Sequence, residues 1–283
     1  MLQNTKITFI GPGAMAEAML SGILKHKLTD PANILASGPL VDRNAELREK
    51  YHILTNTDNI EAASQGDVVI LSVKPQSLQK VLEGMRGAVR KDALVLSIVA
   101  GASIAKISRL LDHEKIVRSM PNTPAQIGEG ITVWFPSHSV NEDEKEITRA
   151  ILGAFGQEVL VDEEEYLDKA TALSGTGPAY VYLFMEAMVD AGVHMGFSRR
   201  IAEQLVTATV RGSVDFYDKD GIDSRHLAAF RNQVTSPGGT TAEALYYLEK
   251  AGFRTAISRA IWAAFQRSKE LGQDADTHPP EKN

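Results

Sequence analysis

The glycines of Gly11–Ala16, which follow the short apolar run Ile7–Ile10, are the first residues of this chain that could do chemistry. Their order is G-x-G-x-x-A. Gly11 permits a tight turn, Gly13 lets a phosphate approach backbone N–H groups, and Ala16 allows a helix to pack closely on the strand. The strand before the motif and the helix-compatible residues after it favour a dinucleotide-binding loop. An ordinary strand-to-helix turn is the alternative reading.

The next strand-like segment, Asn33–Ser37, bears on which dinucleotide would bind. In a dinucleotide fold this strand usually ends in a carboxylate that binds the ribose 2′-hydroxyl, about 20 residues after the glycines. Here it ends in a hydroxyl, and Arg43 follows a few residues later. Ser37 could donate to a 2′-phosphate and Arg43 could pair with it, so NADP(H) is favoured over NAD(H). In the alternative, Arg43 is a solvated loop charge and Asp42 accepts from the ribose.

Three further strand ends could supply residues to a cofactor cleft, because binding residues collect at the carboxyl ends of parallel strands. Val73-Lys74-Pro75 ends one strand and Ala100 follows the next, and small residues and proline there suit the nicotinamide half of a cofactor. Lys74 is interpreted either as a contact to the cofactor or its substrate, or as a simple surface lysine. Asn122 lies between two prolines, in a rigid turn that either presents it to the cleft or is only structural.

Gln233–Leu245 is the second stretch whose residues could do chemistry. Its Pro237-Gly238-Gly239 forces a sharp turn, and Thr240 with Glu243 has the spacing of a capping box, which predicts a helix start. A glycine turn that leads into a helix directs several N–H groups toward one place, as a small carboxylate requires. If Thr240 caps the helix, the hydroxyl of Thr241 stays free. A well-capped helix without a ligand explains the pattern equally well.

Other chemistries find little support in the 283 residues. Cysteine is absent, which excludes thiolate nucleophiles and disulfides. The histidines show no metal or relay spacing, so no metal is expected; they are His26, His52, His113, His138, His194, His226 and His278. A net charge of −6 gives no reason to expect nucleic acid or an anionic membrane as a partner. Without a leader-like segment or a long apolar span, a soluble, cytoplasmic protein is expected.

The elements that must position these residues change in kind along the chain. Up to about residue 162, strand-like runs alternate with helix-compatible segments, and several are continuous Val/Ile/Leu runs, as in strands covered on both faces. This pattern predicts an α/β Rossmann-type, doubly wound, mostly parallel sheet. The further strands are expected at 33–37, 53–55, 68–73, 93–99, 116–120, 131–135 and 158–161.

Beyond Asp162 the sequence predicts helices. Val181, Phe184, Met185, Met188 and Val189 form one apolar helix face, on which the methionines fill a core. Further helices are expected over 198–216, 240–250 and 254–271, with a stop at Gly196. We therefore expect a dinucleotide-binding domain over 1–162, an all-α domain over 163–272 and a disordered tail over 273–283.

Five motifs resemble, in order, those of the pyrroline-5-carboxylate reductases, which form L-proline in the last step of its biosynthesis. They are Gly11–Ala16, Val73–Pro75, Met120–Pro124, Leu173–Tyr180 and Val234–Thr241. The resemblance covers nearly the whole chain, and the last motif is close to the family's signature. It implies NAD(P)H-dependent reduction of 1-pyrroline-5-carboxylate, and a helical dimerisation domain that interleaves with a second copy into a homodimer, often assembled into larger rings.

The resemblance also implies roles for single residues. The N–H groups around Ser236, Gly238 and Gly239 hold the substrate carboxylate, Thr241 hydrogen-bonds the ring nitrogen and Val234 lines the pocket. Thr240, in the same segment, is also expected to bind the substrate. Toward the cofactor it implies Gly11, Pro12, Gly13, Ala14 and Met15 at the pyrophosphate, Ser37 at the 2′-phosphate, Asn59 near the adenosine, and Val73, Lys74, Pro75 and Ala100 along the nicotinamide half. An imine is basic enough to arrive protonated, so orientation is the main requirement.

Two rival functions stay open at this level. A related NAD(P)-dependent imine or hydroxyacid reductase would act on a different substrate, and it would usually offer a catalytic lysine or aspartate on the first long helix after the dinucleotide domain. Lys169 and Ser174–Tyr180 are what that region offers here. A non-catalytic NADP(H)-binding protein is the other rival, against which Thr241 and the glycine turn argue.

Overall fold

The structure, a computed structural model, describes residues 2–220 and 225–277. These residues form two compact units. The first unit contains the described residues up to Gly177 together with those from Ala263 onward, and the second unit is Pro178–Trp262.

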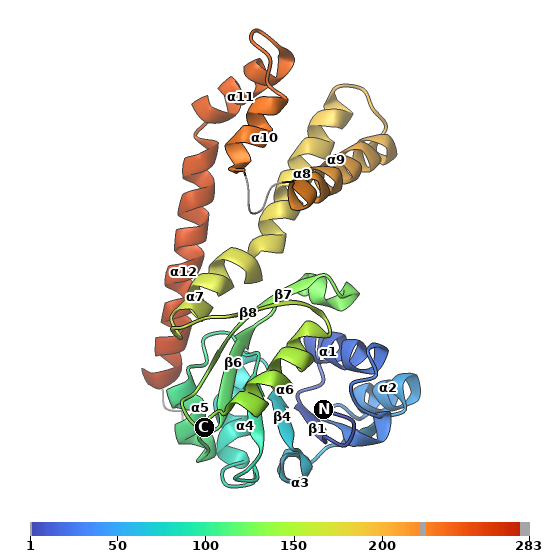
Figure 1. Ribbon diagram of the computed structural model, residues 1–283, viewed down its shortest axis with the longest axis vertical. Helices are drawn as coiled ribbons and strands as arrows, with labels where there is room; N and C mark the ends of the chain where they lie inside the picture. Colours follow the sequence, from blue (N-terminus) through green and yellow to red (C-terminus); the bar gives the residue numbers. More distant parts are fainter. Residues whose placement is uncertain (1, 221–224, 278–283) are drawn as a thin grey trace, which may run out of the picture. The chain divides into compact units, whose positions relative to one another are not determined.

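The first unit is built on a sheet of eight strands (Figure 1). They are β1 (Ile7–Ile10), β2 (Ile34–Ser37), β3 (Leu54–Asn56), β4 (Val68–Leu71), β5 (Leu94–Ser97), β6 (Ile116–Met120), β7 (Gly130–Pro136) and β8 (Gly156–Leu160). Each of the eight strands expected from the sequence is present, with ends that differ by a few residues at most. The expected fold class is confirmed.

The strand order is β3-β2-β1-β4-β5-β6-β7-β8. Strands β1 to β6 pair in parallel, β7 is antiparallel to β6, and β8 is parallel to β7. The direction in which the order grows reverses between β1 and β4, where Ile10 lies opposite Leu71. A crevice beyond the carboxyl ends of strands at such a reversal is the usual ligand site of a doubly wound sheet.

Helices cover the sheet and continue into the second unit. They are α1 (Ala14–Lys25), α2 (Val41–Tyr51), α3 (Asn59–Gln65), α4 (Pro75–Gly84), α5 (Ile104–Leu111), α6 (Glu142–Gly153), α7 (Tyr166–Ala170), α8 (Gly177–His194), α9 (Arg199–Asp220), α10 (Leu227–Gln233), α11 (Thr240–Lys250) and α12 (Phe253–Thr277). Two 3-10 turns lie in loops, at Pro31–Asn33 and Thr123–Ile127, and a π-helical turn at Thr171–Gly175 directly follows α7.

Two apolar cores lie on the two faces of the sheet. Helices α1, α2 and α6 pack on one face and α3, α4 and α5 on the other. Side chains alternate between the faces along each strand, so Phe9 and Ile70 join the first core while Ile10 and Leu71 join the second. Because both faces are covered, these strands are mostly apolar along their length, which explains their continuous apolar runs.

The second unit has a small core of its own. Val189, Ala202 and Val206 are buried between α8 and α9, with Met185 and Met188 packed against them. The expected role of the methionines is confirmed. Gly196, with a φ of +104°, lies in the turn that directly follows the end of α8 at His194. The expected apolar face of α8 is only half covered, because Val181 and Phe184 are 45% and 41% exposed.

The division into units differs from the expected boundary after residue 162. Helix α7 belongs to the first unit, and Leu167 is fully buried there. The second part of α12 also belongs to that unit, where Ser268 donates to Asp168 over 2.9 Å. Helix α12 continues to Thr277, so 273–277 of the expected tail are helical, and 278–283 lie outside the described residues.

Candidate functional site

A cavity of about 610 Å³ opens at the reversal between β1 and β4, where the sequence predicts the dinucleotide loop. The predicted residues that line it are Gly11, Pro12, Gly13, Ser37, Arg43, Asn59, Val73 and Lys74. These residues come from five separate segments of the chain, and the sheet brings their strand ends together. Ala14, Met15, Pro75, Ala100 and Asn122 are predicted cofactor residues that do not line this cavity.

The turn at Gly11–Gly13 has the geometry that the glycine motif predicts. Gly11 has a φ of +93°, and a Cβ there would lie 2.7 Å from Cγ1 of Val73, so both conformation and space require glycine. A Cβ on Gly13 would meet no protein atom within 4 Å. Packing therefore does not require glycine at 13, and the surface in front of it is open to a ligand.

Helix α1 begins directly behind this turn. Its N-cap is Gly13, which has no side chain to cap the helix, so the first-turn N–H groups have no acceptor within the helix. Open N–H groups at a helix N-terminus bind phosphate, and their partial positive charge favours an anion. The residues present therefore fit the pyrophosphate of a dinucleotide.

Ser37 and Asn59 form a pair at the end of β2. Ser37 is fully buried, and its hydroxyl donates to Oδ1 of Asn59 over 2.7 Å. Asn59 opens α3 directly after its N-cap Asp58, whose carboxylate accepts from the N–H groups of Ile60 and Glu61. The Ser37 hydroxyl is thus a donor already engaged within the protein, and its oxygen retains acceptor capacity.

Arg43 lies in the first turn of α2 and is not a solvated charge. Its Nε donates to the carbonyl of Pro12 over 3.1 Å, one Nη pairs with Glu17, and the other pairs with Glu46 at 2.8 Å. That alternative reading of Arg43 is therefore wrong. Asp42 is exposed and does not line the cavity.

Glu17 accepts from Arg43, from Lys50 over 2.8 Å and from the hydroxyl of Tyr51 over 2.9 Å. Burial alone would raise the pKa of Glu17, but these three hydrogen bonds outweigh it and lower the pKa to about 2.

The lowered pKa predicts how stability depends on pH. Glu17 contributes stability that is fully present above its usual pKa of 4.5 and is lost as the pH falls toward 2. We expect Glu17→Gln to lower the melting temperature at pH 7 and to change it less at pH 3. Thermal melts of both proteins between these values would measure this. A difference that stays constant with pH would contradict it.

Asn122 has a structural role in this chain. Its Oδ1 accepts from the N–H of Ile131 over 3.0 Å, and its Nδ2 donates to the carbonyl of Ser174 over 3.3 Å. The side chain ties the start of β7 to the π-helical turn. Its amide therefore fits the reading as a structural turn better than the reading as a cofactor ligand.

Sequence reasoning missed several residues of the cavity wall. Gln76, Ser77 and Lys80 form one face of α4, and Leu40 is 68% exposed at the N-cap of α2. The spacing i, i+1, i+4 after Pro75 was the available signal for the α4 residues. An exposed leucine just after a strand end was the signal for Leu40.

The predicted substrate segment lies in the second unit, between α10 and α11. Ser236–Gly239 forms a turn in which the N–H of Gly239 donates to the carbonyl of Ser236 over 3.1 Å. Pro237 at the second position and Gly238 at the third, with a φ of +69°, are what a type II turn requires. Val234 caps the end of α10 and is 68% exposed.

The capping box predicted for Thr240 and Glu243 is wrong. The N-cap of α11 is Gly239, with no side-chain cap, because the turn delivers the chain to the helix one residue earlier than expected. Thr240 and Thr241 are then the first two helical residues, and the first-turn N–H groups of α11 have no acceptor within the helix. Since the N–H of Gly239 closes the turn, the open donors are those of α11 rather than that of Gly239.

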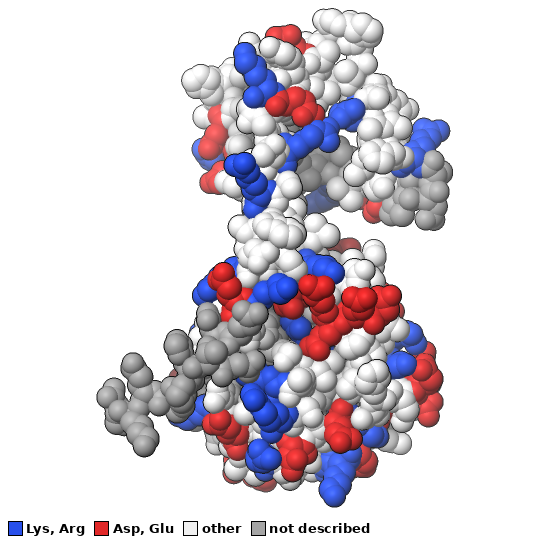
Figure 2. Space-filling model, turned by 90° about the vertical axis from the view of Figure 1, so that its left-hand side faces the viewer, with Lys and Arg blue, Asp and Glu red and all other residues white. Residues whose placement is uncertain are grey.

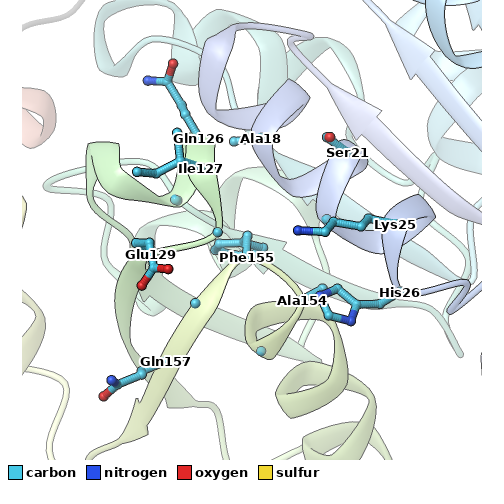
Figure 3. Close-up of a pocket in the computed structure, with 16 residues that line it drawn as sticks. Ala18, Ser21, Lys25, His26, Gln126, Ile127, Glu129, Ala154, Phe155 and Gln157 are labelled. Atoms are coloured by element: carbon cyan, nitrogen blue, oxygen red, sulfur yellow. The ribbon is translucent and has the colours of Figure 1, made fainter.

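A second cavity, of about 510 Å³, lies elsewhere in the first unit (Figure 3). Lys25 and His26 at the end of α1 face Gln126, Ile127 and Glu129 across it. None of the predicted site residues lines it. No residue of the glycine turn Gly11–Gly13 lines it, so we assign it no part in the site.

Within the described part of the chain, no group of three or more His, Asp or Glu residues could hold a metal ion, and no helix there is long and apolar enough to cross a membrane. Figure 2 shows basic and acidic side chains interspersed on the visible face of both units.

A Rossmann-type unit with an open cavity at its glycine turn, in a chain that continues into a separate helical unit, defines an NAD(P)-dependent oxidoreductase. Residues 6–101 match the family described as NADP oxidoreductase coenzyme F420-dependent, and residues 164–271 match pyrroline-5-carboxylate reductase dimerisation.

Individual relatives extend these matches to the whole chain. The pyrroline-5-carboxylate reductase of Synechocystis sp. is 40% identical over 270 residues, which are 95% of this chain and 99% of that protein. The solved pyrroline-5-carboxylate reductase of Coxiella burnetii is 35% identical with a TM-score of 0.86, over 95% of this chain and 99% of that one. The Plasmodium falciparum pyrroline carboxylate reductase, solved with NADP bound, is 33% identical with a TM-score of 0.87, over 96% of this chain and 100% of that one. The chain belongs to the pyrroline-5-carboxylate reductase family.

Proposed function

We propose that this protein reduces 1-pyrroline-5-carboxylate to L-proline, with NADPH preferred over NADH. Family membership over the whole chain supports the substrate. Within the structure, the observation that carries the proposal is the start of α11, where a glycine turn leads into uncapped N–H groups beside Thr241.

The cofactor, when bound, supplies the hydride that reduces the C=N bond of the substrate. The turn at Gly11–Gly13 and the first N–H groups of α1 hold the pyrophosphate. The first-turn N–H groups of α11 hold the substrate carboxylate. The hydroxyl of Thr241 hydrogen-bonds the ring nitrogen and so orients the imine. Because the imine nitrogen is basic enough to carry a proton before reduction, this chemistry needs no separate general acid.

One assay tests the reaction and both rivals. We expect purified protein to oxidise NADPH in the presence of 1-pyrroline-5-carboxylate and to form proline. Oxidation with another cyclic imine or a keto acid, but not with this substrate, would favour a related reductase. Tight NADPH binding with no turnover of any of them would favour a non-catalytic binding protein.

Arg43 should set the cofactor preference. It lines the cavity near Ser37 and carries a charge that can pair with a 2′-phosphate. We expect Arg43→Ala to raise the KM for NADPH roughly tenfold, as for the loss of one hydrogen bond to a charged group, and to leave the KM for NADH within about twofold. Initial rates with both cofactors would measure this. An unchanged ratio of the two KM values would remove Arg43 from cofactor selection.

We also propose that the protein is a homodimer formed through its helical unit. Leu183, Tyr182 and Trp262 are 67%, 63% and 63% exposed, and a single copy buries few apolar side chains there. Exposed apolar surface of this kind marks an interaction site. We expect a dimer or a larger assembly in sedimentation, and dissociation with Leu183→Glu. Ile60→Glu, at an equally apolar exposed position of α3, is the matched control. A monomeric wild-type protein would contradict the proposal.

A further inference from the structure

The wall of the cofactor cavity is supported from behind by a cluster of charged side chains on α1 and α2, helices that lie on the same face of the sheet (Figure 1). Arg43 lines the cavity, whereas its two carboxylate partners, Glu17 and Glu46, are not among the lining residues. Its Nε is bonded to the carbonyl of Pro12, within the glycine turn itself. The guanidinium is therefore held at three of its nitrogens, between the turn and the two carboxylates.

The two carboxylates are held very differently. The side chain of Glu46 is 57% exposed, and it lies one helical turn from Arg43 on the same helix. The side chain of Glu17 is 19% exposed, lies on α1, and accepts from three donors on α2. Lys50 and Tyr51, at the C-terminal end of α2, thus hold the carboxylate of Glu17 in place. Glu17 in turn holds Arg43, which lies in the first turn of the same helix. Glu17 is a rigid support and Glu46 is a flexible one.

We propose that Glu17 is a positioning residue that sets the preference for a 2′-phosphorylated cofactor by holding the guanidinium of Arg43 at the cavity wall. The inference rests on the proposed role of Arg43 in binding the 2′-phosphate. A free arginine side chain loses rotamer entropy when it binds an anion. Because Glu17 already orders Arg43 before a cofactor binds, this side chain loses little further rotamer entropy when the 2′-phosphate binds.

A comparison of matched charge deletions tests the inference. Glu17→Gln and Glu46→Gln each remove one negative charge beside Arg43, but only the first removes the rigid support. We expect Glu17→Gln to raise the Kd for NADPH by about three- to tenfold and to leave the Kd for NADH within about twofold. We expect Glu46→Gln to change neither by more than about twofold. Tyr51→Phe, which removes one donor to Glu17 without changing charge, should shift the Kd for NADPH in the same direction by less.

The second step places Glu17→Gln in an Arg43→Ala background. If Glu17 acts through Arg43, it should then leave the Kd for NADPH unchanged. A loss that persists there, equal changes in the two glutamine variants, or tighter NADPH binding in Glu17→Gln would each overturn the inference. If Arg43→Ala lowers the preference for NADPH and Glu17→Gln does not, this inference fails alone. If Arg43→Ala leaves the preference unchanged, the proposed role of Arg43 fails as well. Thermal melts of each variant exclude unfolding as the cause.

Discussion

Replacing Thr241 by alanine is expected to lower turnover of 1-pyrroline-5-carboxylate by roughly tenfold to a thousandfold, the range for removing one positioned hydrogen bond in an active site. Thr241 is the second residue of α11, half-buried, beside the uncapped N–H groups proposed to hold the carboxylate. Its hydroxyl is the group that this segment offers to the ring nitrogen. Since the cofactor cavity belongs to the first unit, the affinity for NADPH should barely change.

Steady-state rates at saturating NADPH, with a separate cofactor titration, measure this effect. The matched control is Thr240→Ala, because Thr240 precedes Thr241 in the same helical turn and is exposed. It should keep turnover within about threefold of the wild type, as for a surface substitution. Turnover like that of the wild type in Thr241→Ala would remove this residue from the mechanism. A matching loss in Thr240→Ala would point to damage of the helix start instead.

The fold could be predicted from the sequence because its main signals are local. A strand such as Val68–Leu71, covered on both faces, must be apolar throughout, and Gly11 must be glycine because its φ is positive and its Cβ would strike Val73. The cavity followed from the same signals, since the ends of parallel strands share one edge. Most predicted residues that line it, such as Ser37 and Val73, lie at or just after strand ends.

What escaped prediction depends on contacts between distant residues. Arg43 meets Glu17, 26 positions earlier, and no local pattern links the two. The buried Arg118 likewise meets Glu164 and Asp168, 46 and 50 positions later, and no local pattern links it to either. The expected bounds of α11 were right, but its N-cap is Gly239 and not Thr240, because the type II turn rather than the capping pattern decides how the helix begins.

Arg118 carries the second large prediction. It lies on β6, is only 5% exposed, and pairs with Glu164 at 3.1 Å and with Asp168 at 2.9 Å. Glu164 also accepts from the N–H of Ile104 over 2.8 Å, and Asp168 accepts from Ser268 of α12 over 2.9 Å. One guanidinium thus joins the sheet to α7 and, through Asp168, to the second part of α12.

Removing Arg118 leaves two carboxylates close together without a counter-charge. We expect Arg118→Met to lower the free energy of unfolding by about 3 kcal/mol, at the lower end for a broken buried pair because both carboxylates keep some contact with water. Urea titrations followed by circular dichroism at a fixed protein concentration would measure it. Lys145→Met, which breaks the surface pair with Glu142, is the control and should cost no more than about 0.5 kcal/mol.

A second substitution separates loss of the ion pair from loss of packing. If uncompensated charge is the cause, adding Asp168→Asn to Arg118→Met should recover part of the lost stability, although Asp168→Asn alone is destabilising. If the loss comes from packing of the arginine stem on β6, the second substitution should add a further loss of its own. Additive losses would therefore show that Arg118 acts by filling space, and full stability in Arg118→Met would show that neither carboxylate needs it.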